Sequence, residues 1–284
     1  MKKDFPRKDI LNKVILKLKS EKNGYFRVDH KESWLNFLET GDLVFTPYEL
    51  HEILKKVIKE FPPNGDKLFY LRKRRNFHVE DKKACRPEEA LERFITVSNP
   101  GNFFNQIPIG GKKESIDIGI KEENESRFVF IELKPWQSNN SPLYAIVESL
   151  KNLIEYRAIQ NDERKAIKRH KYFKDYDEKV DLIVLAPKSY YVDHGMIDKS
   201  KGQYLQDKIS IVRKVLNDFS SEFRTNISLM ILPIDKKHFD DECSKVCSKY
   251  KKTEGKQNIV ISNDDFIPIL AKDKWELLVS SDKK

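Results

Sequence analysis

The fold is decided by Ser115-Ile116-Asp117-Ile118-Gly119-Ile120 together with Phe128-Val129-Phe130-Ile131-Glu132-Leu133-Lys134. Both stretches alternate with a period of two, which is the pattern of β-strands whose two faces meet different surroundings. In the first strand the isoleucines are expected on one face and Asp117 on the other. In the second, Glu132 and Lys134 are expected to share a face. The sequence therefore predicts two neighbouring strands that carry acidic and basic side chains.

The polar run Lys121–Ser126 predicts a hairpin loop between these strands. If the loop is symmetric, Asp117 lies directly opposite Glu132, with Cβ atoms roughly 5 Å apart. Two carboxylates at that separation repel by about 3 kcal/mol at an effective dielectric constant of about 20. A divalent cation would offset this repulsion, and Mg²⁺ favours sites with one or two carboxylates. The alternative is that Lys134 or water neutralises the pair and that nothing is bound.

Further elements are expected on either side of the hairpin. A proline at the first helical position predicts a helix from Pro87, which Asn99-Pro100-Gly101 ends. Ser141-Pro142 supplies an N-cap and a first-turn proline for a second helix. The run Leu182-Ile183-Val184-Leu185 has the composition of a strand that is buried on both faces. The other expected elements are the strand Phe103–Ile109, the helix Ser141–Ile159, the strand Asp181–Ala186, the helix Gln206–Phe223 and the strand Ile227–Leu232.

This order of elements and its acidic motif resemble the PD-(D/E)XK nuclease superfamily. The matching residues are Asp117 and Glu132-Leu133-Lys134, within a region from about Pro87 to Leu232. Ile116 stands where many members have proline. The resemblance implies an α/β fold with a central mixed β-sheet flanked by helices, which is the restriction-endonuclease-like core of order α-β-β-β-α-β.

The resemblance also implies roles for these residues. Asp117 and Glu132 would bind a metal ion together with the main-chain carbonyl of Leu133. Lys134 would orient or help deprotonate the attacking water and hold the scissile phosphate. The implied cofactor is Mg²⁺, with Mn²⁺ able to substitute, because a bound cation lowers the pKa of water and screens charge on phosphorus.

Members of the superfamily often add a glutamate from the first helix. Glu88 is favoured, because it shares the face of the buried stripe near the helix start. Glu92, one turn later, is the alternative, and Glu89 is expected to face solvent. Acidic residues in a first turn are also favoured by the helix dipole without any catalytic role.

The helix after the motif carries Glu148, Asn152 and Tyr156 at steps of four, which places them on one side. Relatives often have a glutamine followed four residues later by tyrosine at this place, and Asn152 with Tyr156 resembles that pair. Glu148 is a candidate for reaching a second metal ion. The alternative is a polar helix edge, with Tyr156 in the core.

The charge of the chain is unevenly distributed. The net charge is +9 and the isoelectric point is near 9.1, which favours acidic partners such as nucleic acids. Residues 1–86 hold 21 Lys and Arg against 13 Asp and Glu, so the surplus lies almost entirely in the N-terminal part. Two clusters are candidates for binding nucleic acid, with solvated surface as the alternative. Their residues are Arg72, Lys73, Arg74, Arg75, Lys168 and Arg169.

Two units are predicted, a basic and mostly helical one at residues 1–84 and a nuclease-like one at 85–284 with C-terminal accessory elements. The N-terminal unit leaves open a homodimer or a protein partner. Three cysteines without a signal peptide suggest a reducing cytoplasm, and no apolar run is long enough to span a membrane. The expected function is metal-dependent hydrolysis of phosphodiester bonds by an endonuclease, with DNA rather than RNA as the substrate, in prokaryotic defence or mobile-element biology. The alternative is a non-catalytic nucleic-acid-binding or protein-interaction protein on the same fold.

Overall fold

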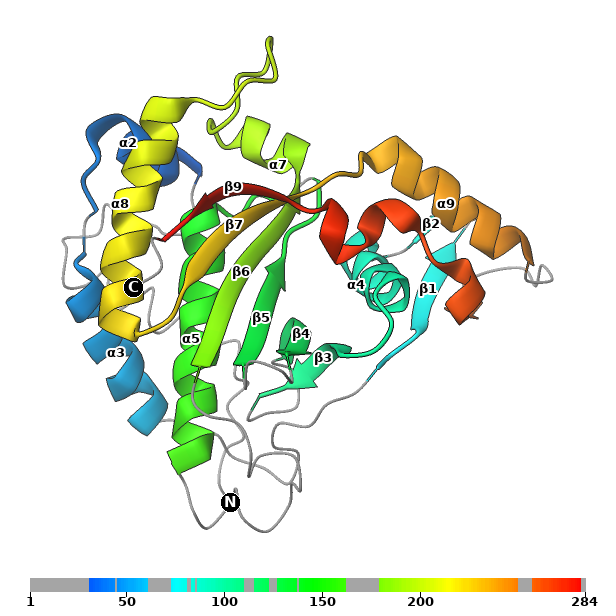
Figure 1. Ribbon diagram of the computed structural model, residues 1–284, viewed down its shortest axis with the longest axis horizontal. Helices are drawn as coiled ribbons and strands as arrows, with labels where there is room; N and C mark the ends of the chain where they lie inside the picture. The colour runs from blue at the N-terminus through cyan, green and yellow to red at the C-terminus, as the bar shows by residue number, and fades with distance from the viewer. Residues whose placement is uncertain are drawn as a thin grey trace.

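A six-stranded mixed sheet lies at the centre of the structure, with strand order β3-β4-β5-β6-β7-β9 (Figure 1). This computed structural model describes residues 31–43, 45–60, 73–80, 83–84, 86–109, 115–122, 127–136, 138–161, 179–249 and 257–281. The helices are α2 (Lys31–Thr40), α3 (Pro47–Glu60), α4 (Pro87–Ser98), α5 (Pro142–Asn161), α7 (Lys188–Asp193), α8 (Gln206–Phe223) and α9 (Lys236–Lys249). The strands are β1 (Asn76–Glu80), β2 (Lys83–Ala84), β3 (Phe103–Pro108), β4 (Ser115–Glu122), β5 (Arg127–Leu133), β6 (Lys179–Pro187), β7 (Ile227–Leu232), β8 (Gln257–Val260) and β9 (Glu276–Ser280).

The sheet changes from antiparallel to parallel pairing at β5. Strands β3, β4 and β5 pair antiparallel, whereas β5, β6 and β7 pair parallel. Parallel neighbours need a crossover connection, and α5 and α8 lie in the two crossovers. The predicted α/β class, with a mixed sheet flanked by helices, is confirmed.

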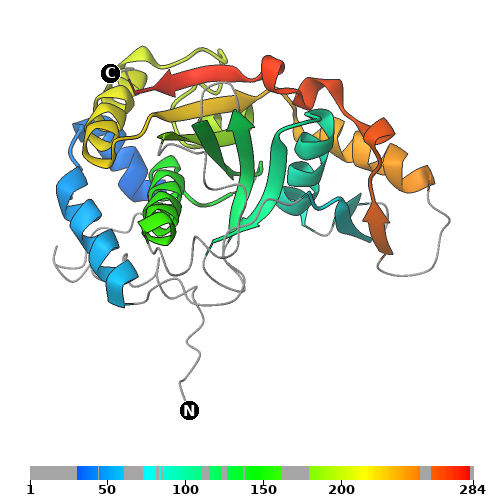
Figure 2. The same ribbon diagram turned by 60° about the horizontal axis from the view of Figure 1, so that its bottom comes forward.

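The two faces of the sheet bury separate hydrophobic clusters. One cluster lies under α2, α3, α5 and α8, and the other under α4, α9 and a small sheet of order β2-β1-β8 (Figures 1 and 2). Along β5, Phe128 and Phe130 face the first cluster, whereas Val129, Ile131 and Leu133 face the second. This alternation is the predicted one, and we name the two sides of the sheet the α5 face and the α4 face.

The helix starts follow the local signals in the sequence. Pro87 is at the first position of α4, and the side chain of Ser141 accepts a hydrogen bond from the Tyr144 N–H at the start of α5, at 3.1 Å. At the start of α3, Thr46 and Glu49 form a reciprocal capping box: the Thr46 N–H donates to Glu49 at 2.7 Å and the Glu49 N–H donates to Thr46 at 3.2 Å. These caps fix the boundaries of the helices beside the candidate site.

The alternation of β4 breaks at Asp117. Ile118 and Ile120 pack on the α4 face as expected, but Ile116 belongs to the cluster on the α5 face. The prediction that the three isoleucines share one face is therefore wrong. The cause lies on the paired strand, where Gln106 has a φ of 50° in the left-handed region that non-glycine residues seldom adopt. The register of β3 with β4 places Gln106 opposite Asp117, so both strands change faces at this point.

The segments on either side of residue 84 pack together. Helices α2 and α3 bury Trp34, Phe37 and Leu54 in the cluster that also contains residues of α5 and α8, and β1 pairs with β8. The C-terminal strand β9 is an integral strand of the main sheet, paired with β7, rather than an accessory element. The described N-terminal elements thus form one body with the sheet that carries the motif.

Among the described residues, no helix is both long enough and apolar enough to cross a membrane. Cys243 and Cys247 are free thiols, buried one turn apart on α9, and burial raises the pKa of Cys243. Cys85 and residues 1–30 of the predicted N-terminal unit lie outside the described residues.

Candidate metal centre

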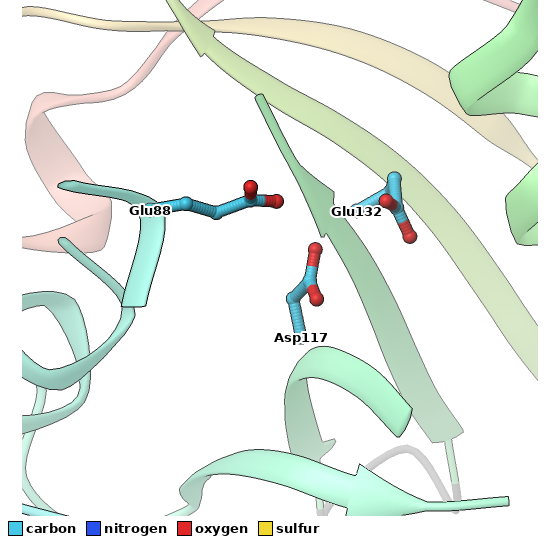
Figure 3. A group of neighbouring side chains, drawn as sticks. All are labelled: Glu88, Asp117 and Glu132. Carbon is cyan, nitrogen blue, oxygen red and sulfur yellow. The ribbon is translucent and has the colours of Figure 1, made fainter. Parts of the chain in front are cut away.

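Three carboxylates converge at the end of the sheet. Glu88 extends from the first turn of α4, Asp117 from β4 and Glu132 from β5, and the three side chains point toward a common space (Figure 3). One oxygen of each lies within 4.8 Å of those of the other two. This spacing allows all three to bind a single ion, because Mg²⁺ and Mn²⁺ prefer oxygen ligands at short distances. Glu88, favoured over its neighbours from the sequence, is the helix residue in this cluster.

The register of the hairpin is the predicted one. Ile118 pairs with Ile131 at the end of the paired segment, and extending this register by one residue places Asp117 opposite Glu132. The Leu133 N–H donates a hydrogen bond to Asp117 Oδ2 at 2.9 Å, which fixes the side chain of Asp117 across the strand end. The main-chain carbonyl of Leu133 as a further metal ligand stays a prediction.

Lys134 lies beside the carboxylates and is almost completely buried, with 4% of the residue exposed. Its Nζ donates to Glu132 Oε1 at 2.6 Å and to Glu148 Oε2 at 3.1 Å, and it lies 5.9 Å from the centre of the Tyr144 ring. The lysine thus neutralises Glu132 directly, as the alternative from the sequence allows. Asp117 and Glu88 keep a geometry that is open to a cation.

The acidic residues repel one another strongly enough to change their protonation. Burial and, after it, the neighbouring carboxylates of Glu92 and Glu88 hold the pKa of Asp117 well above its usual range. Burial, followed by the charges of Asp117 and Glu148, does the same to the pKa of Glu132. Ionising both carboxyl groups in the metal-free site is therefore unfavourable. A divalent cation would offset this repulsion.

Lys134 and Glu148 are shifted toward their charged forms. Burial alone would lower the pKa of Lys134, but Glu132, Glu148 and Asp117 outweigh it and raise that pKa well above its usual range. Burial would raise the pKa of Glu148, yet Lys134 and its other partners hold that pKa below its ordinary value. Lys134 is therefore a fixed positive charge in the metal-free protein.

The raised pKa values predict that metal binding depends on pH. Protons compete with a cation for Asp117 and Glu132, so affinity is lost as the pH falls below their raised pKa values and gained as it rises. While one carboxyl group remains protonated, the affinity for Mn²⁺ should rise about tenfold per pH unit. Calorimetric titration at several pH values, in buffers of different ionisation enthalpy, measures both the affinity and the released protons. An affinity that does not change with pH would contradict this assignment.

Glu92, the alternative helix ligand, is not one of the three clustered carboxylates, and it bonds to partners of its own. Arg93 Nη1 donates to it at 2.6 Å, and the side-chain amide of Gln106 donates to both of its oxygens at 2.9 Å. Burial is the main cause that raises the pKa of Glu92 to about 8. Gln106 was not foreseen from the sequence, because its left-handed backbone arises only in the paired strands.

The residues of α5 divide between the site and the core. Glu148 contacts Lys134, and Asn152 is buried in the wall of the same cavity. Tyr156 packs on Phe130 on the α5 face with ring centres 5.1 Å apart, so its position agrees with the core alternative. Lys151 also lines the cavity and was missed in the sequence, although its place three residues after Glu148 puts it on the same side of the helix.

The carboxylates lie in a cavity of about 980 Å³. Its charged lining residues are Glu88, Glu89, Glu92, Asp117, Glu132, Glu148, Arg74, Arg86, Lys134 and Lys151. Of the predicted nucleic-acid contacts, Arg74 reaches this cavity, whereas Arg72, Lys168 and Arg169 lie outside the described residues. Lys73 is exposed and Arg75 half-buried, and Lys73 Nζ donates to the carbonyl of Gly101.

Comparison of the chain with models of protein families, with curated proteins and with solved structures finds no match. The geometry of the carboxylates and of Lys134 is therefore the basis for assigning a function.

Proposed function

We propose that this protein is a metal-dependent nuclease that hydrolyses phosphodiester bonds, with DNA as its substrate and Mg²⁺ or Mn²⁺ as its cofactor. The observation that carries the proposal is the convergence of Glu88, Asp117 and Glu132 within 4.8 Å, next to a buried lysine that bonds to Glu132. Buried like charges cost free energy in the metal-free protein, and such sites recur where proteins bind metals or perform catalysis.

The order of elements supports a PD-(D/E)XK core. Helix α4, strands β3, β4 and β5, helix α5 and strand β6 follow one another as α-β-β-β-α-β. The motif residues lie on β4 and at the end of β5, and α4 supplies Glu88. The setting in prokaryotic defence or mobile elements, and the cytoplasmic location, remain parts of this proposal.

For the proposed reaction, Asp117, Glu132 and Glu88 would hold the cation. A bound divalent cation makes water a stronger nucleophile and screens the charge that develops on the phosphate oxygens. Lys134, whose raised pKa keeps it protonated, donates hydrogen bonds to the phosphate or to the attacking water. It acts as a positive charge rather than as the base that removes the proton.

A second candidate function is favoured by one observation. Because Lys134 already bonds to both Glu132 and Glu148, the carboxylates are partly neutralised without any ion. This arrangement is sufficient for a protein on the same fold that binds nucleic acid or a protein partner without cleaving it, because such a protein needs no metal ion at these carboxylates. The two proposals differ in whether the site turns over substrate.

Metal dependence tests the proposed activity. The purified protein should cut plasmid DNA or labelled oligonucleotides with Mg²⁺ or Mn²⁺, and EDTA should abolish the cleavage. RNA oligonucleotides of the same sequence serve to decide the substrate class.

Glu132→Ala should be inactive, whereas Glu39→Ala, an exposed acidic residue on α2 away from the cavity, should cut like the wild type. Cleavage that survives both chelation and Glu132→Ala would come from a contaminant or another site. Binding without cleavage under all metal conditions would favour the second candidate.

A further inference from the structure

The segment Lys73–Arg75 leads directly into β1. Arg74 is exposed and lines the same cavity as Glu88 and Asp117. Since acidic residues outnumber basic ones in this cavity, a polyanion would be repelled unless cations at the rim offset the repulsion. Arg74 is in a position to supply one of these cations.

The main chain of Arg74 is held by a buried amide. Asn105, which has 0% of its surface exposed, accepts a hydrogen bond from the Arg74 N–H at 2.7 Å and donates to the Arg74 carbonyl at 3.0 Å. The main-chain N–H and the carbonyl of Arg74 are thus both hydrogen-bonded to the side chain of Asn105 on β3. Such a two-point contact fixes the position from which the arginine side chain extends.

The neighbouring residues of the segment are anchored as well. Lys73 donates to Gly101 O and lies 5.4 Å from the centre of the Phe104 ring. Arg93 Nε donates to Asn76 O at 3.1 Å, and the Ile261 N–H donates to Arg75 O at 3.0 Å. Each residue of the segment Lys73–Arg75 therefore makes a hydrogen bond to a neighbouring part of the fold. Arg74 is the residue of this segment that lines the cavity.

The guanidinium group of Arg74 differs from the two lysine side chains of the cavity. Lys134 bonds to two glutamates, and Lys151 lies 3.7 Å from Glu155. No hydrogen bond or ion pair with the Arg74 side chain is found within the described part of the chain. A fixed backbone with an uncommitted fork of five donors is suited to bind a phosphate.

We propose that Arg74 binds a backbone phosphate of the nucleic acid next to the scissile one, and that Asn105 is the positioning residue that holds Arg74 there. This inference rests on the proposed function, because it concerns how that site binds its substrate. The contact is to phosphate and not to a base, so it acts on any sequence. It differs from Lys134, which acts at the reacting phosphate.

Steady-state kinetics on a short duplex test the first part. Arg74→Ala should raise KM about tenfold and leave kcat within about twofold, since a contact made equally before and during reaction affects binding alone. Arg74→Lys should restore part of the loss. Arg213→Ala is the matched control, because Arg213 is an exposed residue of α8, which does not line the cavity.

Binding without turnover separates this inference from the proposed activity. In metal-free buffer, fluorescence anisotropy should show that Arg74→Ala weakens binding to DNA and RNA oligonucleotides and lowers the salt dependence of log K by about 0.7 to 0.9. Two unrelated sequences should lose affinity equally, whereas a sequence-dependent loss would mean base recognition.

If the wild type cleaves nucleic acid but Arg74→Ala leaves KM, affinity and salt dependence unchanged, the inference fails and the proposed function stands. If the wild type binds nucleic acid but never cleaves it, a loss of affinity in Arg74→Ala would support the phosphate contact, whereas the proposed nuclease activity would be wrong.

A double-mutant cycle tests Asn105. Asn105→Leu removes both hydrogen bonds at similar volume and should raise KM as Arg74→Ala does, with no further increase when the two are combined. Asn105→Asp keeps the acceptor for the Arg74 N–H and should have a smaller effect. Additive increases in KM, in variants whose circular dichroism and Tm show a folded protein, would mean that Asn105 does not act through Arg74. If Asn105→Leu does not fold, the comparison between Asn105→Asp and Arg74→Ala carries the test.

Discussion

Replacement of Lys134 by methionine is expected to lower the cleavage rate about a thousandfold, with nucleic-acid binding changed by less than about threefold. Methionine keeps the length and apolar character of the side chain but removes the charge, which in the wild type bonds to Glu132 at 2.6 Å. The reacting phosphate then loses the positive charge that is fixed beside it. Single-turnover cleavage and anisotropy on the same oligonucleotide measure the two quantities.

The control for this variant must separate catalysis from stability. Breaking a buried ion pair by removing one partner costs about 3 to 5 kcal/mol, so Lys134→Met should be assayed where unfolding curves show a folded protein. Lys236→Met removes an exposed lysine of α9 and should leave both the rate and the unfolding curve nearly unchanged. Equal losses of binding and of cleavage in Lys134→Met would contradict a role at the reacting phosphate and favour a binding protein.

Replacement of Asp117 by asparagine is expected to abolish metal binding and yet to stabilise the metal-free protein by about 1 kcal/mol. Burial and the charges of Glu92 and Glu88 disfavour the charged form of Asp117, and asparagine removes that unfavourable charge. The amide oxygen can still accept the hydrogen bond from the Leu133 N–H. Calorimetric titration with Mn²⁺ and thermal unfolding in EDTA measure the two effects.

The stabilisation by Asp117→Asn should depend on pH. A carboxyl group whose pKa is raised by folding contributes stability that is present at low pH and lost as the pH rises through that pKa. The gain from asparagine should therefore be larger at pH 8 than at pH 5. Asp207→Asn, at an exposed position, should show neither effect. A destabilised Asp117→Asn with intact Mn²⁺ binding would remove Asp117 from the metal centre.

Much of the sheet and of its flanking helices could be predicted because the signals are local. Helix α8 and strand β7 have the predicted boundaries, since an apolar period and flanking polar residues define them without reference to the rest of the chain. The register of Asp117 opposite Glu132 follows from the length of the polar run between two alternating strands. Glu88 could be favoured because helical geometry places it above the buried residues of α4.

The remaining features depend on contacts between distant residues. The addition of β9 to the main sheet and the packing of α2 and α3 under it are set by partners far away in the sequence. The same holds for Gly119, where an added Cβ would meet Ile107 Cδ1 at 2.3 Å, so that its identity is decided across the strand pair. The place of Lys151 in the cavity wall and the contact of Asn105 with Arg74 likewise depend on how α5 and β3 pack in the folded chain.

The change of faces at Gln106 and Asp117 has a consequence for any attempt to alter this protein. Ile107 and Ile116 pack on one side of the sheet and Ile118 on the other, so the strand that carries Asp117 packs against both hydrophobic layers in turn. Close-packed interiors transmit small displacements instead of absorbing them. Cavity-forming substitutions in either layer, many residues away from the carboxylates, should therefore be detectable as weaker metal affinity before they are detectable as unfolding.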